Sequence, residues 1–458
     1  MPYKQCVLCG SFTSLPPPPN FGRSFAQDHP HRVNQEIMFN AGLLPVLFDT
    51  LDQEDQPAEV LRAVFRCMRC LADQFTEVQK AMFGRLDLLL TVQTEHDGWQ
   101  NDLALAVTEI FTDNQKMCLA MKPAQIERMV EMLVTLNVDV PDLLVALRAV
   151  VMVDELNVPL KRNQDLIMKS LMQHREEVIT SGYIDGREYS AMDERRVDLL
   201  RYDGKDEGNR RLLMYHIKLV SLLSACAEGE NRYIESVCQS LLSIDDILAV
   251  LLDDDVKLSA KTAYARFFLW VYINTGATPA EAGTQALATD QRLWQALRRN
   301  AELAMQSRAL DAECKLFLFD AFVPLLMLLV HKHYRPRRYP ESQNVLNDIA
   351  KMISSFLQRN LNHIHKHEHI KALGGVLAAI SAKETTFVKG RDMVAVREKL
   401  THHEAGLAES QSLRQYRKTY QKQVELNKYL NMYVANVRMS YNGDNVVAVQ
   451  IPQSTNDR

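Results

Sequence analysis

Apolar residues recur at helical spacing almost without interruption from Val33 to about His403. The intervening connections are short, and several start at a proline, as at Pro57, Pro123 and Pro141. So long a series of helices cannot close into one compact bundle, whereas neighbouring helices can stack as an α-solenoid. Because no repeat of fixed period is evident, the sequence predicts an all-α fold, an irregular armadillo- or HEAT-like solenoid of stacked helix pairs.

The helical pattern divides into two halves around a polar interruption. The predicted divisions are a flexible, proline-containing tail (1–32), an amino-terminal solenoid half (33–180), a charged loop segment (181–211), a carboxy-terminal solenoid half (212–403), and a polar helix with a disordered tail (404–458). The predicted helices lie near 35–51, 58–74, 76–91, 100–114, 123–137, 140–155, 162–176, 259–275, 290–306, 309–333, 342–360, 368–381 and 391–403.

Composition limits the classes of function. The formal charge is −4, which argues against a general binder of nucleic acid or anionic membrane. Eight scattered cysteines suit a reducing cytosol better than a disulfide scaffold. The longest apolar segment, Leu316 to Val330, contains Asp320 and Pro324 and is shorter than the ~20 residues of a membrane span. We therefore expect no signal peptide and no direct membrane span in this chain.

The most informative stretch is Leu212 to Leu242, which reads as two amphipathic helices around a tight turn. Gly229 is placed to end the first helix in a left-handed conformation, and Asn231 to cap the second. The acidic residues of the turn, Glu228, Glu230 and Glu235, are expected at cap and solvent positions. The residues expected to pack this hairpin are Tyr215, Leu219, Leu222, Leu223, Cys226, Ile234, Val237, Cys238 and Leu241.

Two CxxC pairs raise the question of a metal site. Cys6 and Cys9 lie in the tail, where His29 and His31 could complete a zinc site across the proline run. Cys67 and Cys70 lie at i,i+3 on a predicted helix, where packing as small hydrophobes is the better interpretation. Neither pair has an obvious partner pair, so we expect no metal here, with Cys6 and Cys9 as weak candidates.

The run from His363 to His369 alternates histidine with other residues. On a helix only His363 and His367 share one face, whereas an extended strand would align all four histidines for zinc or nickel. Apolar neighbours favour the helix, so a solvated or loop-capping run is expected, with His363 and His367 as weak ligand candidates.

Other charged clusters fit surface roles. Asp245, Asp246 and the run Asp253 to Asp255 lack the spacing and glycine of a calcium loop, and Ser243 with Asp246 resembles a capping box. The basic cluster from Lys332 to Arg338 could meet a phosphate or an acidic partner but fits a surface loop better. No catalytic motif occurs, so we expect neither an enzyme nor a cofactor.

Residues 213–251, LMYHIKLVSLLSACAEGENRYIESVCQSLLSIDDILAVL, resemble the central solenoid of inositol trisphosphate receptors, a homology module shared with ryanodine receptors. Weaker resemblance appears at 78–90, 163–172, 261–275 and 370–383. The whole resemblance covers about 33–400 and is strong only at 210–275. No segment resembles the family's ligand-binding core or pore, and none of its calcium-sensing carboxylates can be assigned to a residue of this sequence.

The resemblance implies a cytosolic regulatory or structural solenoid of a calcium-release channel at the endoplasmic reticulum, as a fragment or divergent homologue. Its partners would be other domains or subunits of the channel and protein regulators, with no nucleic acid. It would transmit ligand-driven movement toward the pore. The alternative is a stand-alone armadillo-like adaptor that binds peptides or protein partners along a groove.

Overall fold

The computed structural model describes residues 28–53, 56–92, 98–153, 158–178, 181–184, 187–190, 196–202, 206–306, 311–334, 340–360 and 367–383. All of them belong to one compact unit, Met1–Glu404. The described helices before the polar interruption are α1 (Asp28–Asn40), α2 (Leu43–Leu51), α3 (Ala58–Ala72), α4 (Thr76–Phe83), α5 (Leu86–Leu89), α6 (Gln100–Phe111), α7 (Gln115–Ala120), α8 (Pro123–Leu136), the 3-10 helix η1 (Asn137–Asp139), α9 (Asp142–Val151), α10 (Lys161–Gln173) and α11 (Arg175–Val178).

The described helices after it are α12 (Arg196–Arg201), α13 (Glu207–Ala227), α14 (Arg232–Leu241), α15 (Ile244–Leu252), α16 (Leu258–Phe268), the π-helix η2 (Leu269–Ile273), the 3-10 helix η3 (Leu287–Thr289), α17 (Gln291–Gln306), α18 (Ala312–Leu316), the π-helix η4 (Phe317–Phe322), α19 (Val323–Lys332), α20 (Pro340–Asn360) and α21 (His367–Lys383). The predicted helices at 391–403 and beyond lie outside the described residues.

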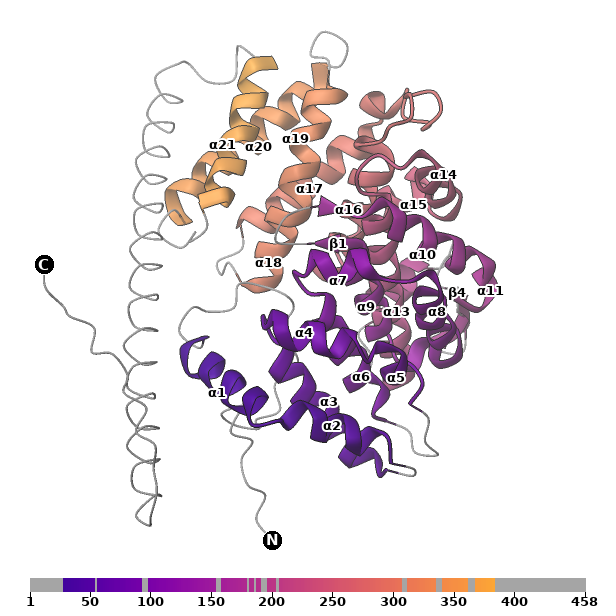
Figure 1. The fold of residues 1–458 in the computed structure, drawn as a ribbon. Helices are drawn as coiled ribbons and strands as arrows, with labels where there is room; N and C mark the ends of the chain where they lie inside the picture. Colours follow the sequence, from indigo (N-terminus) through magenta and orange to yellow (C-terminus); the bar gives the residue numbers. More distant parts are fainter. Residues whose placement is uncertain are drawn as a thin grey trace, which may run out of the picture. The chain divides into compact units, whose positions relative to one another are not determined.

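A row of long helices runs through the stack in sequence order. α3 packs on α6, α6 on α9, α9 on α13 and α13 on α16, and α16 then meets η4 (Figure 1). Shorter helices join this row from the side: α4 packs on α6, α7 on α9 and α10 on α13. Each helix buries an apolar stripe against its neighbours along the chain, as the periodicity requires. The predicted all-α stack of helices is confirmed.

The predicted charged loop, 181–211, differs from the structure. β3 (Ser181–Ile184) pairs antiparallel with β4 (Arg187–Ser190), and α12 follows. Asp185-Gly186 between the strands is a strong sequence signal for a hairpin turn, which charge content obscured. A second strand pair joins β1 (Met152–Val153) to β2 (Val158–Pro159) between α9 and α10.

The apolar segment Leu316 to Val330 lies within a helix, as the predicted helix at 309–333 requires. α18, η4 and α19 run together from Ala312 to Lys332, and this is the one helix among the described residues long and apolar enough to cross a membrane. Of its most apolar window, 61% is buried against the rest of the chain. Packing of this kind is what a core helix shows.

Candidate functional site

The α13–α14 hairpin is packed on both sides. Leu222, Cys226, Ile234 and Cys238 have no exposed surface, and Leu219, Leu223 and Leu241 are buried with them. Tyr215 is also buried and donates its hydroxyl to the Val178 carbonyl at 2.8 Å, whereas Val237 is half-buried. Burial raises the pKa of the Cys226 and Cys238 thiols, so both stay protonated and pack as small hydrophobes.

The turn between α13 and α14 needs a glycine for two reasons. Gly229 has φ +95°, in the left-handed region that side chains disfavour. A Cβ at this position would also lie 2.7 Å from Cγ of Pro159, which approaches from the start of α10. Gly229 therefore lets the α13–α14 turn and the α10 start come into contact.

Asn231 precedes α14 as predicted, but its side chain does not cap the helix. Its Nδ2 instead donates to Oδ1 of Asp165 on α10 at 2.6 Å. The prediction of a side-chain cap was wrong, because the hydrogen bond from Nδ2 to Asp165 directs the side chain toward α10, and its oxygen accepts no N–H at the start of α14.

The expectation of cap and solvent positions holds for Glu230, which is exposed, and Glu228 is the carboxyl-cap residue of α13, but Glu228 and Glu235 are buried and not solvated. Glu228 is 4% exposed, and its Oε2 lies 3.9 Å from Nη2 of Arg266. Glu235 is 1% exposed and accepts hydrogen bonds from the Thr275 hydroxyl and, at 3.4 Å, from the Gly276 backbone N–H. Both carboxylates serve contacts between helices, which the sequence pattern of a single helix cannot reveal.

Glu235 is one of four equivalent residues, which we call the polar ladder: Gln79, Cys118, Gln164 and Glu235. Each is the fourth residue of its helix, α4, α7, α10 or α14, and each is buried. The spacings between them are 39, 46 and 71 residues, and the first two lie near the repeat length of roughly 40–47 residues known for HEAT and armadillo arrays. Gln79, Gln164 and Glu235 bind the turn after the next helix of the row, whereas Cys118 binds a carbonyl within α9.

Gln79 and Gln164 each donate to two carbonyls at the end of a helix, whereas the Cys118 thiol lies between the carbonyls of Phe111 on α6 and Ala149 on α9. Nε2 of Gln79 donates to the carbonyls of Glu109 (2.9 Å) and Thr112 (3.2 Å) at the end of α6. Sγ of Cys118 contacts the Ala149 carbonyl near the end of α9 at 3.4 Å, and burial raises the pKa of this thiol to about 12.

Gln164 completes the series at the α13–α14 turn, where its Nε2 donates to the carbonyls of Ala225 and Glu228, both at 2.9 Å. Helix carboxyl ends carry carbonyls without intrahelical partners, so these side chains satisfy groups that burial would otherwise leave unpaired.

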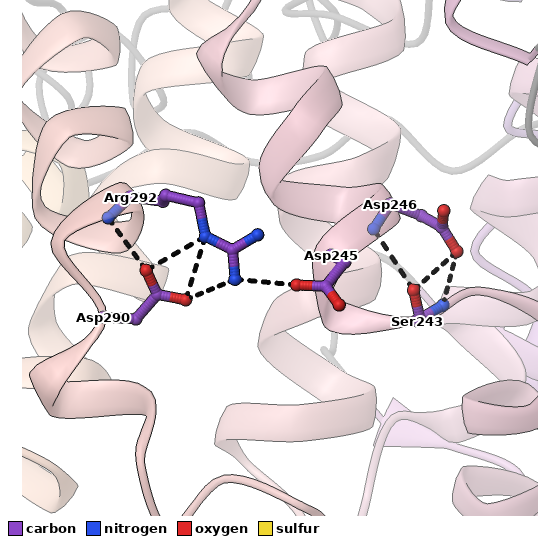
Figure 2. A network of polar contacts seen from close by, with 5 residues as sticks. All are labelled: Ser243, Asp245, Asp246, Asp290 and Arg292. Carbon is purple, nitrogen blue, oxygen red and sulfur yellow. Dashed lines mark hydrogen bonds and ion pairs between the residues drawn. The ribbon is translucent and has the colours of Figure 1, made fainter.

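The acidic patch on α15 is neutralised within the chain. Figure 2 shows Ser243 and Asp246 in a capping box and Asp245 bonded to Arg292 at 2.7 Å. Arg292 also holds Asp290 at 2.7 Å, and this hydrogen bond lowers the pKa of Asp290. Asp253 pairs with Arg201. Asp246 caps its own helix as predicted, whereas Asp245 and Asp253 pair with arginines of α17 and α12. Asp245 stays 73% exposed, as expected at a solvated helix end.

The metal candidates fall largely outside what the structure describes. Cys6, Cys9 and His363 lie outside the described residues, and of His367 only the backbone, at the start of α21, is described. Cys67 and Cys70 are half-buried on α3. Within the described part of the chain, no three His, Cys, Asp or Glu side chains gather as a metal site requires.

The basic cluster is described only in part. Lys332 donates its Nζ to Oδ1 of Asn274 at 2.7 Å, linking the end of α19 to the turn after η2. Residues 335–339, which contain the three arginines, lie outside the described residues. The sequence pattern found the cluster, and the described contact gives Lys332 a structural role.

Comparisons with known proteins find similarity over part of the chain. Residues 32–182 match the family model of the RIH domain. The chain is 32% identical over 100 residues to the inositol 1,4,5-trisphosphate receptor itr-1 of Caenorhabditis elegans, which is 22% of this chain and 4% of that receptor. The RIH match ends before the stretch at 213–251 and includes Gln79, Cys118 and Gln164.

Among solved structures, one that matches at low similarity is a crystal structure of an engineered protein. The TM-score is 0.39 at 16% sequence identity, with 82% of this chain and 90% of that chain covered. A likeness of this degree supports no conclusion about function.

Proposed function

Because this chain carries an RIH domain and is a relative of the inositol 1,4,5-trisphosphate receptors, we propose that it is a cytosolic regulatory solenoid of an intracellular calcium-release channel. In this role it passes ligand-driven movement along its helices toward the pore. Its partners are other domains or subunits of the channel, at the cytosolic face of the endoplasmic reticulum. It performs no catalysis.

The observation that carries the proposal is the continuity of packing beyond the RIH match. α13 packs on both α9 and α10, so the helices after residue 206 stack directly on the RIH segment. Nζ of Lys218 lies 2.6 Å from Oδ1 of Asp142, in a half-buried ion pair between α13 and α9. Packed helices with such contacts move as rigid bodies, so a tilt of one end reaches the other.

The test uses cells from which this chain has been removed, with release of stored calcium evoked by inositol trisphosphate as the readout. We expect the wild-type chain and the exposed control Met214→Ala to restore release, and the buried variant Leu222→Asp on the same helix to fail. Release that is unchanged by removal of the chain would overturn the channel proposal. Binding of extended peptides by the full chain would then support the adaptor.

A further inference from the structure

The polar ladder does more than satisfy carbonyls. We infer that it is the coupling device of the stack, and that Gln164 is the residue through which the RIH segment and the helices after it move together. The use of this coupling in a channel rests on the proposed function, whereas the coupling itself is a property of this chain alone.

The direction of the hydrogen bonds supports coupling. Gln79, Gln164 and Glu235 each lie on one helix pair and bind the turn of the next pair, so three turns are held by a side chain from the pair before. Cys118 contacts a carbonyl inside the next helix, α9. A helix pair that tilted by itself would leave buried carbonyls without donors. Buried polar groups without partners are costly, so the neighbouring pairs favour moving together.

The contact at Gln164 crosses the boundary of the RIH match. Gln164 lies within residues 32–182, and the carbonyls that it binds, at Ala225 and Glu228, lie beyond them. A second hydrogen bond joins the same elements, from Asn231 to Asp165, and Pro159 of β2 lies close against Gly229. The start of α10 therefore holds the α13–α14 turn by two adjacent residues, Gln164 and Asp165, with Pro159 packed beside them.

The last ladder residue, Glu235, accepts hydrogen bonds where the glutamines of the ladder donate them. Gln79 and Gln164 donate to carbonyls, whereas Glu235 accepts from the Thr275 hydroxyl and the Gly276 N–H. The turn after η2 thus presents donors where the earlier turns present acceptors. The side-chain type at each ladder position matches the turn that it must bind.

The experiment is hydrogen–deuterium exchange on the full chain, read segment by segment. The probe of coupling is Leu222→Ala, which loosens α13 from within. In the otherwise wild-type chain we expect it to speed exchange in α9 and α10 as well as in α13 and α14. Gln164→Leu removes both hydrogen bonds that Nε2 donates, with a side chain of similar volume. In this background we expect the increase in exchange rate that Leu222→Ala causes in α9 and α10 to fall about tenfold.

Gln79→Leu is the control, since it removes two equivalent donated hydrogen bonds at the α6–α7 turn inside the RIH segment, together with the one that Gln79 accepts from Asn114. It should leave the spread from Leu222→Ala into α10 unchanged. Gln164→Met, of nearly equal length, replaces Gln164→Leu if that variant does not fold. An equal spread with and without Gln164 would overturn the inference. Loss of calcium release in cells does not enter this readout, so the two proposals fail separately.

Discussion

The α6–α7 and α13–α14 turns share one geometry built from different residues. Each long helix ends in an extended residue, Thr112 or Glu228, and the next residue has a positive φ, Asp113 at +53° or Gly229 at +95°. An asparagine then precedes the short helix in both: Asn114 before α7 and Asn231 before α14. A glutamine from the preceding pair binds the helix end in each case.

The difference lies in what the asparagine does. Asn114 accepts from the Met117 N–H, and its Nδ2 donates to Oε1 of Gln79 at 2.7 Å, so cap and ladder residue are locked together. The second turn contains one additional residue, Glu230, also at positive φ, and Asn231 binds Asp165 instead. Oε1 of Gln164 is buried without a hydrogen bond in the described structure. Both asparagines therefore bind the preceding helix pair, but only Asn114, in the turn without the additional residue, also caps its own helix.

The largest effect is expected from Leu222→Ala. Counted from the helix end, Leu222 corresponds to Ala106 of α6, and both are fully buried. The variant should lose roughly 2–5 kcal/mol of unfolding free energy, because it removes buried apolar groups from α13 and leaves a cavity. At the corresponding position α6 has an alanine, so its neighbours already pack against a small side chain. Urea denaturation measures the loss. A loss below about 0.5 kcal/mol would show that the face is not part of a core.

Gly229→Ala tests whether the close approach of Pro159 adds to the cost of the positive φ at this position. The variant should cost roughly 2–4 kcal/mol, since a strained φ is combined with a clash on Pro159. Gly42→Ala is the control, because Gly42 also has a positive φ but no atom lies within 4 Å of an added Cβ. Thermal unfolding compares the two. Equal losses would mean that the close approach of Pro159 has no energetic role.

The two asparagines should respond differently to alanine. Asn114→Ala removes a helix cap and the partner of Gln79, and should cost roughly 1–2 kcal/mol. Asn231→Ala removes one exposed hydrogen bond and should cost less than about 1 kcal/mol. Chemical denaturation at neutral pH is the measurement. A reversed order would contradict the assignment of the cap to Asn114 alone.

The smallest effect concerns Arg292, which binds Asp245 on α15 and Asp290 just before α17 (Figure 2). These contacts depend on charge, whereas the two turns are held by amide side chains. The Arg292 hydrogen bond lowers the pKa of Asp290 below its ordinary value of 3.8. Its stabilisation is therefore present above about pH 4 and lost as the pH falls through the lowered pKa. Arg292→Met should be slightly less stable than wild type at pH 7, and the difference should vanish in acid. A difference independent of pH would exclude the ion pair as its cause.

Periodicity was sufficient to predict most of the helices, because burial of an apolar stripe is a local property of the sequence. It missed α7, a six-residue helix too short to show a period, and merged α1 with α2 across Gly42. The hairpin β3–β4 was missed although Asp185-Gly186 marks it. The charged residues of this segment favoured a loop, although an Asp-Gly pair is typical of a hairpin turn.

The ladder could not be predicted because its residues have no common type. Gln79, Cys118, Gln164 and Glu235 share a position in their helices, and all their partners except the Asn114 amide and the Thr275 hydroxyl are backbone groups, which carry no sequence signal. A repeat of this kind leaves no pattern of side-chain identity in the sequence. The buried positions of Glu228 and Glu235 depend likewise on helices distant in sequence, α16 and the turn after η2.

The interval from Gln164 to Glu235 is longer than the others and contains β3, β4 and α12, yet Gln164 still finds its turn. Register in this stack is therefore set by which turn a side chain binds, whatever the length of chain in between. The length of chain between two ladder residues can therefore vary without changing which turn each of them binds.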